Sequence, residues 1–170
     1  MDRLLFASVL MGILGFGCKE SMPSAKVDEE KPVFSAKLPL KPPADWREKV
    51  VDGKTLLVGP TIDGFAPNIN LVTENSPGDL AAYVNLSVEN LEGHRPGIQF
   101  VERKSFKTKG GIEGIKCVTL STSQNSTWRQ TYYFFDAADS KKLVFSCTVP
   151  ADHGEELAPK FDEIIGTYQP

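Results

Sequence analysis

Short runs of alternating apolar and polar residues, separated by turn residues, occupy the first part of the chain after residue 44. Trp46–Val50 and Lys54–Val58 flank Asp52-Gly53, and glycine tolerates the positive φ that a tight hairpin turn needs. Asn68–Thr73 alternates in the same way. The pattern therefore predicts a hairpin followed by a third strand.

The segment that follows has helical periodicity. Ser76 is predicted to cap the helix, with Pro77 at its first position and Asp79 three residues after the cap. Gly93 is predicted to end it. One apolar face, spaced to pack against a sheet, is formed by Leu80, Tyr83, Val84, Val88 and Leu91.

Four more strands are predicted in series, separated by turn-rich segments. They are Ile98–Lys107, Ile112–Leu120, Thr127–Phe135 and Leu143–Val149. The last is apolar on both faces, so both faces of the sheet need cover. A C-terminal helix, capped by Asp152 and kinked or split at Pro159, is expected to supply part of it.

A different pattern occupies the N-terminus. An apolar and small stretch of 13 residues, Leu4–Phe16, follows Arg3. It is shorter than the roughly 20 residues that span a bilayer as a helix, but it has the length of a signal-peptide apolar region. We interpret residues 1–17 as a targeting segment.

Leu14-Gly15-Phe16-Gly17-Cys18 resembles the lipobox of bacterial lipoproteins. The resemblance implies that Cys18 becomes the first mature residue and carries a diacylglycerol and a further palmitate-type acyl chain. Two chains anchor a protein stably. The chain would then be held at the bacterial cell membrane outside the cytoplasm, and Lys19 would favour the outer membrane in a two-membrane cell. The alternative is an ordinary secretory signal cut elsewhere.

Residues 18–43 are predicted to be the lipidated cysteine and a flexible tether, because prolines and charges replace any sustained apolar period. Val33, Phe34, Leu38 and Leu40 could dock as an edge segment. The folded domain is placed at residues 44–170.

Composition and charge restrict the classes of ligand that we expect. The 19 basic and 22 acidic residues give a net charge of −3 without blocks, so nucleic acid is not an expected partner. Three cysteines and two histidines are not clustered, which argues against a metal site, and no cofactor motif is present.

The element order resembles the Mog1/PsbP-like fold, and most closely the bacterial DcrB- and LpqN-like lipoproteins. The hairpin opened by Trp46, the segment Phe65-Ala66-Pro67-Asn68-Ile69-Asn70 and the ending Gly166-Thr167-Tyr168 carry the likeness. It implies an α+β domain with an antiparallel sheet of about six to seven strands and helices on both faces. It also implies an accessory or assembly role without a shared catalytic motif.

Few residues stand out as candidate sites. His94 and His153 are expected at loop edges without chemistry, since no nucleophile motif lies near either. Phe65, with Asp63, lies in a turn-rich loop and is the leading partner-binding candidate, although Phe65 could instead fold back onto the core. Trp128, like Trp46, is expected to pack in the core or at the sheet edge.

Cys117 and Cys147 are predicted to stay free. Their strands should flank Thr127–Phe135, about 9–10 Å apart, beyond the roughly 7 Å that a disulfide allows.

The sequence therefore favours a non-catalytic binding or assembly module of the cell envelope. Its expected partner is an envelope protein. Two alternatives stay open. One is an envelope enzyme whose site carries no recognisable motif, and the other is a carrier with a dry cavity between sheet and helix.

Overall fold

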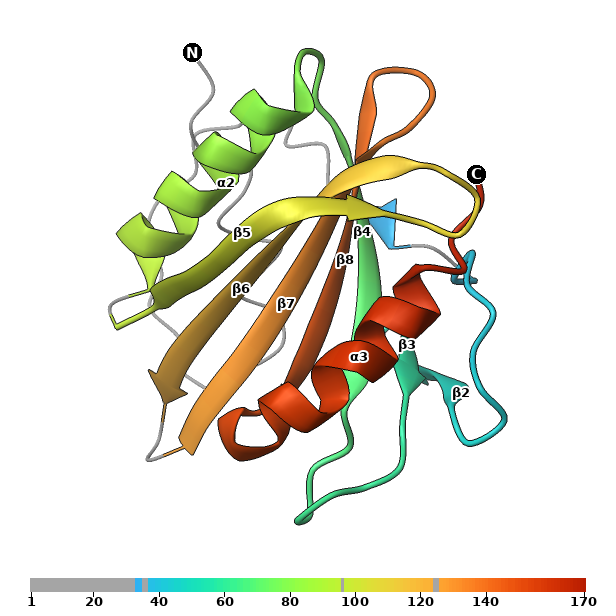
Figure 1. The fold of residues 1–170 in the computed structure, drawn as a ribbon, viewed down its shortest axis with the longest axis vertical. Helices are drawn as coiled ribbons and strands as arrows, with labels where there is room; N and C mark the ends of the chain where they lie inside the picture. Colours follow the sequence, from blue (N-terminus) through green and yellow to red (C-terminus); the bar gives the residue numbers. More distant parts are fainter. Residues whose placement is uncertain (1–32, 35–36, 96, 124–125) are drawn as a thin grey trace.

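A single antiparallel sheet organises the domain. The computed structural model describes residues 33–34, 37–95, 97–123 and 126–170. Seven strands follow the order β2-β3-β4-β8-β7-β6-β5, and β1 pairs beside them with β4 (Figure 1). The strands are β1 (Val33–Phe34), β2 (Arg47–Val51), β3 (Lys54–Val58), β4 (Asn68–Asn75), β5 (Gln99–Lys107), β6 (Glu113–Ser123), β7 (Ser126–Asp136) and β8 (Lys141–Pro150).

The predicted strands and their turns are present. Asp52 and Gly53 both have positive φ, 49° and 75°, and close the β2–β3 hairpin. The strands β5 to β8 form the expected meander, and β8 then pairs with β4. The prediction of an antiparallel α+β fold with six to seven strands is confirmed.

Helix α2 (Leu80–His94) starts later than the sequence suggested. The prediction that Ser76 caps it is wrong, because Asp79 is the cap and accepts a hydrogen bond from the Ala82 amide at 3.0 Å. Gly78, at φ +103°, breaks the helical path before it can begin at Pro77. Gly93 lies inside the helix instead of ending it.

The predicted cap of the C-terminal helix is also wrong. A short 3-10 turn, η2 (Ala151–His153), precedes α3 (Gly154–Ile165), so Asp152 lies in that turn and His153 is the cap residue, without a capping side-chain bond. Helix α3 continues through Pro159 without a split. Proline removes one hydrogen bond there, but the buried residues that follow it fix the helix to the sheet.

Two apolar clusters lie on opposite faces of the sheet because adjacent strand residues alternate between them. Helix α3 crosses one face (Figure 1), and α2 packs on β6 and β7 from the other. The α3-side cluster includes Leu57, Ile69, Leu71, Tyr133, Phe135, Phe145, Phe161, Ile164, Ile165 and Tyr168. The α2-side cluster includes Tyr83, Val84, Leu91, Cys117, Tyr132, Phe134 and Val144. The expectation that both faces are covered is confirmed for this part of the sheet.

Packing begins before residue 44. Val33–Phe34 pair with β4, and Leu38 is 3% exposed within the α3-side cluster, with Leu40 packed against it. A domain boundary at residue 44 therefore leaves out residues that belong to the fold. Leu38 and Leu40 therefore dock on the domain, as the sequence allowed.

Cys117 and Cys147 are free and buried. Their strands flank β7 as predicted, and the register adds a further separation. Cys117 belongs to the α2-side cluster, whereas Cys147 belongs to the α3-side cluster. The two thiols therefore lie on opposite faces of the sheet, which excludes a disulfide between them.

Candidate functional site

The loop between β3 and β4 ends in a tight two-residue turn. Ile62 and Phe65 exchange backbone hydrogen bonds of 2.8 and 3.0 Å. Between them, Asp63 and Gly64 take positive φ values of 48° and 81°. Glycine and aspartate tolerate this conformation better than most residues. The turn therefore holds Asp63 at the tip and Phe65 at the return of the loop.

Phe65 packs on Trp128 at the start of β7. Their ring centroids are 4.7 Å apart and the rings are tilted by 57°. Both side chains are half-buried. Phe65 thus neither enters the core nor stands free, and it forms an aromatic pair at the end of the sheet. Trp128 lies at the beginning of β7, an inner strand, and is therefore not at the sheet edge, whereas Trp46 is 5% exposed in the core, as the sequence allowed.

His153 ties this loop to the beginning of the last helix. Its Nε2 donates to the Asp63 carboxylate at 2.7 Å, and its Nδ1 lies 3.6 Å from the Glu156 carboxylate. The Asp63 hydrogen bond is the main cause that raises the pKa of His153. The His153–Asp63 contact could not be predicted from local sequence patterns, because 90 residues separate the two side chains.

The pKa shift predicts a pH-dependent contribution to stability. Since the folded-state pKa of His153 is raised, its contacts stabilise the fold below its unfolded pKa of about 6.5, and this is lost as pH rises through the folded pKa. The wild type should therefore exceed a His153→Gln variant in Tm more at pH 5.5 than at pH 8.5. Thermal melts at both pH values test this, and equal differences would contradict it.

His94 makes no comparable contact. It is exposed at the end of α2, and its Nδ1 donates to the Asn90 carbonyl oxygen at 2.8 Å. Within the part of the chain that the structure describes, no group of three or more His, Cys, Asp or Glu could hold a metal ion.

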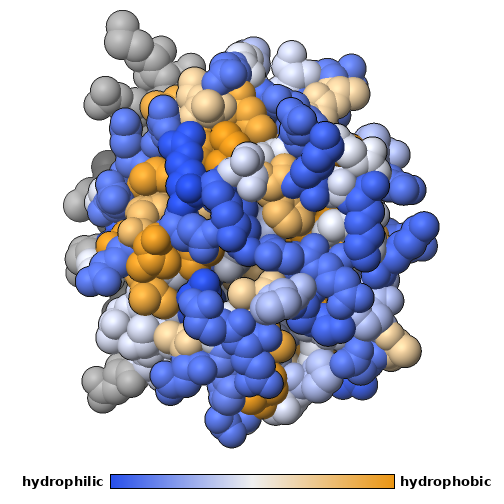
Figure 2. Space-filling view, in the orientation of Figure 1, coloured by the Kyte–Doolittle hydropathy of each residue, from blue (hydrophilic) through white to orange (hydrophobic). Residues whose placement is uncertain are grey.

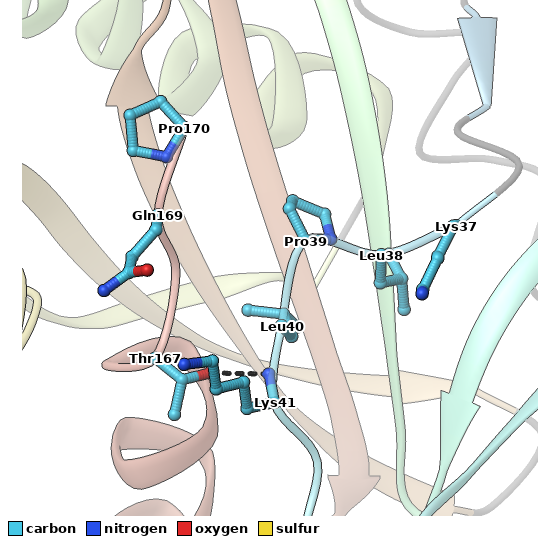
Figure 3. Close-up of a pocket in the computed structure, with 8 residues that line it drawn as sticks. All are labelled: Lys37, Leu38, Pro39, Leu40, Lys41, Thr167, Gln169 and Pro170. Carbon is cyan, nitrogen blue, oxygen red and sulfur yellow. Dashed lines mark hydrogen bonds between the residues drawn. The ribbon is translucent and has the colours of Figure 1, made fainter.

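A shallow groove of about 470 Å³ lies where the segment that enters the domain meets the C-terminal residues (Figure 3). Lys41 donates its backbone N–H to Thr167 Oγ1 across it at 2.8 Å. Lys37, Leu38, Pro39, Leu40, Gln169 and Pro170 complete the lining. The groove is therefore the place where residues 37–41 meet the C-terminal residues 167–170.

Exposed apolar side chains elsewhere are scattered. In the view of Figure 2 the surface around α3 is mostly hydrophilic. The apolar surface lies toward α2 and the neighbouring part of β5. Among the described residues, the large exposed apolar side chains are Val50, Val51, Leu86 and Val101, on β2, α2 and β5. Single exposed apolar residues are normal on protein surfaces. The Phe65–Trp128 pair is the better candidate because three separate segments hold it in place.

Of the predicted site residues, Phe65 and Asp63 lie in this loop, and Cys18 lies outside the described residues. None of the helices among the described residues is long and apolar enough to cross a membrane.

Comparison with known proteins identifies the fold of this chain and gives no information on its activity. No family model matches this chain, and no curated protein matches it in sequence. Among solved structures, LpqN of Mycobacterium tuberculosis, a protein involved in cell envelope biogenesis, aligns at 17% identity with a TM-score of 0.58. The alignment covers 79% of this chain and 86% of LpqN.

Two further structures align. A protein of unknown function from Pseudomonas aeruginosa has 14% identity and a TM-score of 0.57, covering 75% of this chain and 98% of its own. The PsbP protein of the cyanobacterium Synechocystis has 11% identity and a TM-score of 0.49, covering 87% and 96%. The predicted LpqN-like fold is confirmed by the LpqN alignment.

Proposed function

We propose that this chain is a membrane-tethered, non-catalytic binding or assembly accessory module of the bacterial cell envelope. The fold shared with LpqN, which is involved in cell envelope biogenesis, supports the compartment. The resemblance of residues 14–18 to a lipobox supports the lipid anchor. A tethered domain acts on partners within reach of its loops.

The observation that carries the binding role is the Phe65–Trp128 pair. The turn at Asp63 and Gly64, the tilted ring contact with Trp128 and the hydrogen bond from His153 to Asp63 hold Phe65 in one place. A prearranged, half-exposed aromatic pair loses little conformational entropy when a partner covers it. Tryptophan is enriched among residues that dominate binding energy, and phenylalanine is enriched at the buried centre of interfaces.

The surroundings of His153 favour this role over catalysis. A general base needs a ring nitrogen that is free to take a proton from substrate. Here one nitrogen is bonded to Asp63 and the other faces Glu156, and both carboxylates stabilise the protonated ring. The arrangement suits a loop anchor.

Phe65→Ala is expected to weaken retention of the envelope partner by about 30-fold or more, the loss typical of a central binding residue. Because Phe65 is half-buried, the cost in unfolding free energy should stay near 1–2 kcal/mol, below the roughly 3–5 kcal/mol of a core phenylalanine. Crosslinking in native membranes, with quantitative mass spectrometry of the retained proteins, measures the first effect. Thermal melts measure the second.

Leu86→Ala is the matched control, because Leu86 is an apolar residue 57% exposed on α2, away from the loop. It should leave retention unchanged, as should His94→Ala. Unchanged retention in Phe65→Ala would contradict the proposed site. Loss of function in His94→Ala with an intact fold would favour an enzyme instead.

Cys18→Ser should abolish the lipid anchor, because the thiol accepts the diacylglycerol in lipoproteins and a hydroxyl does not. The variant should accumulate as an uncleaved precursor without acyl chains. Intact-mass spectrometry of the membrane fraction checks both properties. A wild-type mature chain that starts elsewhere and carries no lipid would disprove the anchor.

A further inference from the structure

Acidic side chains surround the Phe65–Trp128 pair. The β3–β4 loop and the beginning of α3 lie at the same end of the molecule (Figure 1), where the hydrogen bond from His153 to Asp63 joins them. These two segments and the short η2 turn carry four exposed acidic residues. We call them the acidic rim: Asp63, Asp152, Glu155 and Glu156.

The cations at this end of the molecule are less exposed than the carboxylates that they pair with. The Arg129 side chain is 11% exposed, whereas that of Glu155, to which it donates, is 85% exposed. The His153 side chain is 23% exposed, and its partners Asp63 and Glu156 are 81% and 75% exposed. The charged groups that face solvent here are therefore mainly carboxylates.

The charges of the rim do not cancel. Arg129 balances Glu155, and a protonated His153 balances one of its two neighbouring carboxylates. Four carboxylates and two cations leave two negative charges, or three when His153 is neutral. This local excess is comparable with the net charge of −3 of the whole chain. A partner that covers the aromatic pair must therefore complement negative charge.

We propose that the Phe65–Trp128 pair and the acidic rim together receive an arginine side chain from a basic segment of the partner protein. The face of an aromatic ring attracts a cation, and tryptophan does so most strongly. A guanidinium group is planar and carries several N–H donors, so it can stack on a ring and pair with a carboxylate at the same time. Asp63 is two residues before Phe65, so the loop itself offers both groups.

Other kinds of partner fit this surface less well. An acidic segment would be repelled by the rim. A wholly apolar segment would remove water from exposed carboxylates without replacing their hydrogen bonds. A lysine side chain would match the charge but lacks the planar group that stacks on a ring. Charge and ring chemistry together therefore favour arginine.

This inference rests on the proposed binding function and specifies the chemistry of the partner segment. An exposed ion pair contributes little by itself, because water and salt screen it. The ring contact adds to the pairing, and the excess of negative charge speeds the encounter with a basic segment. The affinity should therefore fall as the salt concentration rises.

The test uses the nitrogen-15-labelled full chain and two synthetic peptides as probes. One is an end-blocked Gly-Arg-Gly-Arg-Gly peptide, and in the other citrulline, which has nearly the same shape without the charge, replaces both arginines. The chain has two tryptophans, so the indole N–H signals report on Trp128 at the site and on Trp46 in the core. The arginine peptide should shift the Trp128 signal alone. The citrulline peptide should bind at least about tenfold more weakly.

A variant of the rim tests the role of charge. Asp152→Asn/Glu156→Gln removes two negative charges and keeps the shortest ion pairs of Arg129 and His153. It should bind the arginine peptide about threefold to tenfold more weakly, with a Tm close to that of the wild type. Phe65→Ala should also weaken binding of this peptide, because it removes one of the two rings.

Glu89→Gln/Glu92→Gln is the matched control. It removes two exposed carboxylates from α2, so the net charge changes by the same amount as in the rim variant. The control should bind the arginine peptide like the wild type. High salt should weaken binding in the wild type and in the control, because it screens the rim in both.

Three results would overturn the proposal. They are equal binding of the citrulline peptide, a Trp128 signal that does not shift, and unchanged affinity in Asp152→Asn/Glu156→Gln. Loss of partner retention in Phe65→Ala without any binding of the arginine peptide would keep the binding loop and reject the basic partner. Unchanged partner retention in Phe65→Ala, with specific binding of the arginine peptide, would contradict the proposed function and keep the site for a basic side chain.

Discussion

Replacing Phe145 by alanine is expected to lower the free energy of unfolding by about 3–5 kcal/mol. Phe145 is 0% exposed at the centre of β8, where its ring lies 6.0 Å from that of Phe135 and 5.4 Å from that of Tyr168. Truncation removes the buried ring and leaves a cavity between the sheet and the C-terminal residues. Urea unfolding should show a lower midpoint with an unchanged slope.

The matched control is Val101→Ala on β5. Val101 is 48% exposed, so its truncation should change stability by no more than about 0.5 kcal/mol. A loss below about 1 kcal/mol for Phe145→Ala would mean that the α3-side cluster is loosely packed. A changed slope would mean that the variant no longer unfolds in the same two-state transition.

The importance of Phe145 could be predicted from the sequence. Leu143–Val149 is apolar at successive positions, and a strand of that kind must be buried on both faces. The same local reasoning found the Asp52-Gly53 hairpin and the helical face that contains Tyr83 and Val84. These features depend on residues close together in the chain, and for that reason a sequence reveals them.

The helix starts were less predictable. Both Ser76 and Asp79 are good capping residues, and the choice between them depends on the backbone at Gly78, which takes a positive φ. Glycine permits that conformation without requiring it. In the last helix, Pro159 was expected to kink or split the helix. The helix is not split, because the contacts of Phe161 and Ile165 with the sheet outweigh one missing hydrogen bond.

The candidate site was predictable only in part. Phe65 and Asp63 were suggested by the turn residues around them, whereas their partners Trp128 and His153 lie far away in sequence. Those contacts exist because β3, β4, β8 and β7 are neighbours in the sheet, and the β4–β8 pairing brings the loop to β7. Pair geometry of this kind depends on strand order and register, which local patterns do not encode.

An ion pair between β6 and α3 could not be predicted either, because its two residues are far apart in the sequence. Lys116 on β6 is 3% exposed, and its Nζ donates to Asp162 Oδ1 at 2.7 Å. The Tyr133 hydroxyl donates to the same oxygen at 2.6 Å. Burial, followed by the nearby Cys147 and Asp162, raises the pKa of Tyr133, so this hydroxyl stays a donor. Asp162 thus balances a charge and a hydroxyl that have little access to water.

Asp162→Ala is therefore expected to destabilise the protein strongly. A buried lysine without its carboxylate pays the cost of an unpaired charge, about 3–5 kcal/mol for a fully buried pair. Because the Asp162 side chain is 37% exposed, water can replace part of the lost contact, and we expect about 2–4 kcal/mol. Urea unfolding of the single variant measures the loss. Glu163→Ala, which removes an exposed carboxylate paired with Lys160 next along the helix, should have little effect.

Lys116→Met in the same chain should reverse most of that loss, since it removes the charge that Asp162 neutralises and keeps the buried volume nearly the same. The double variant should be more stable than Asp162→Ala alone, so the two substitutions should be clearly non-additive in a double-mutant cycle. Additive losses would mean that each side chain contributes by packing alone. A stable Asp162→Ala variant would mean that Lys116 reaches water once its partner is gone.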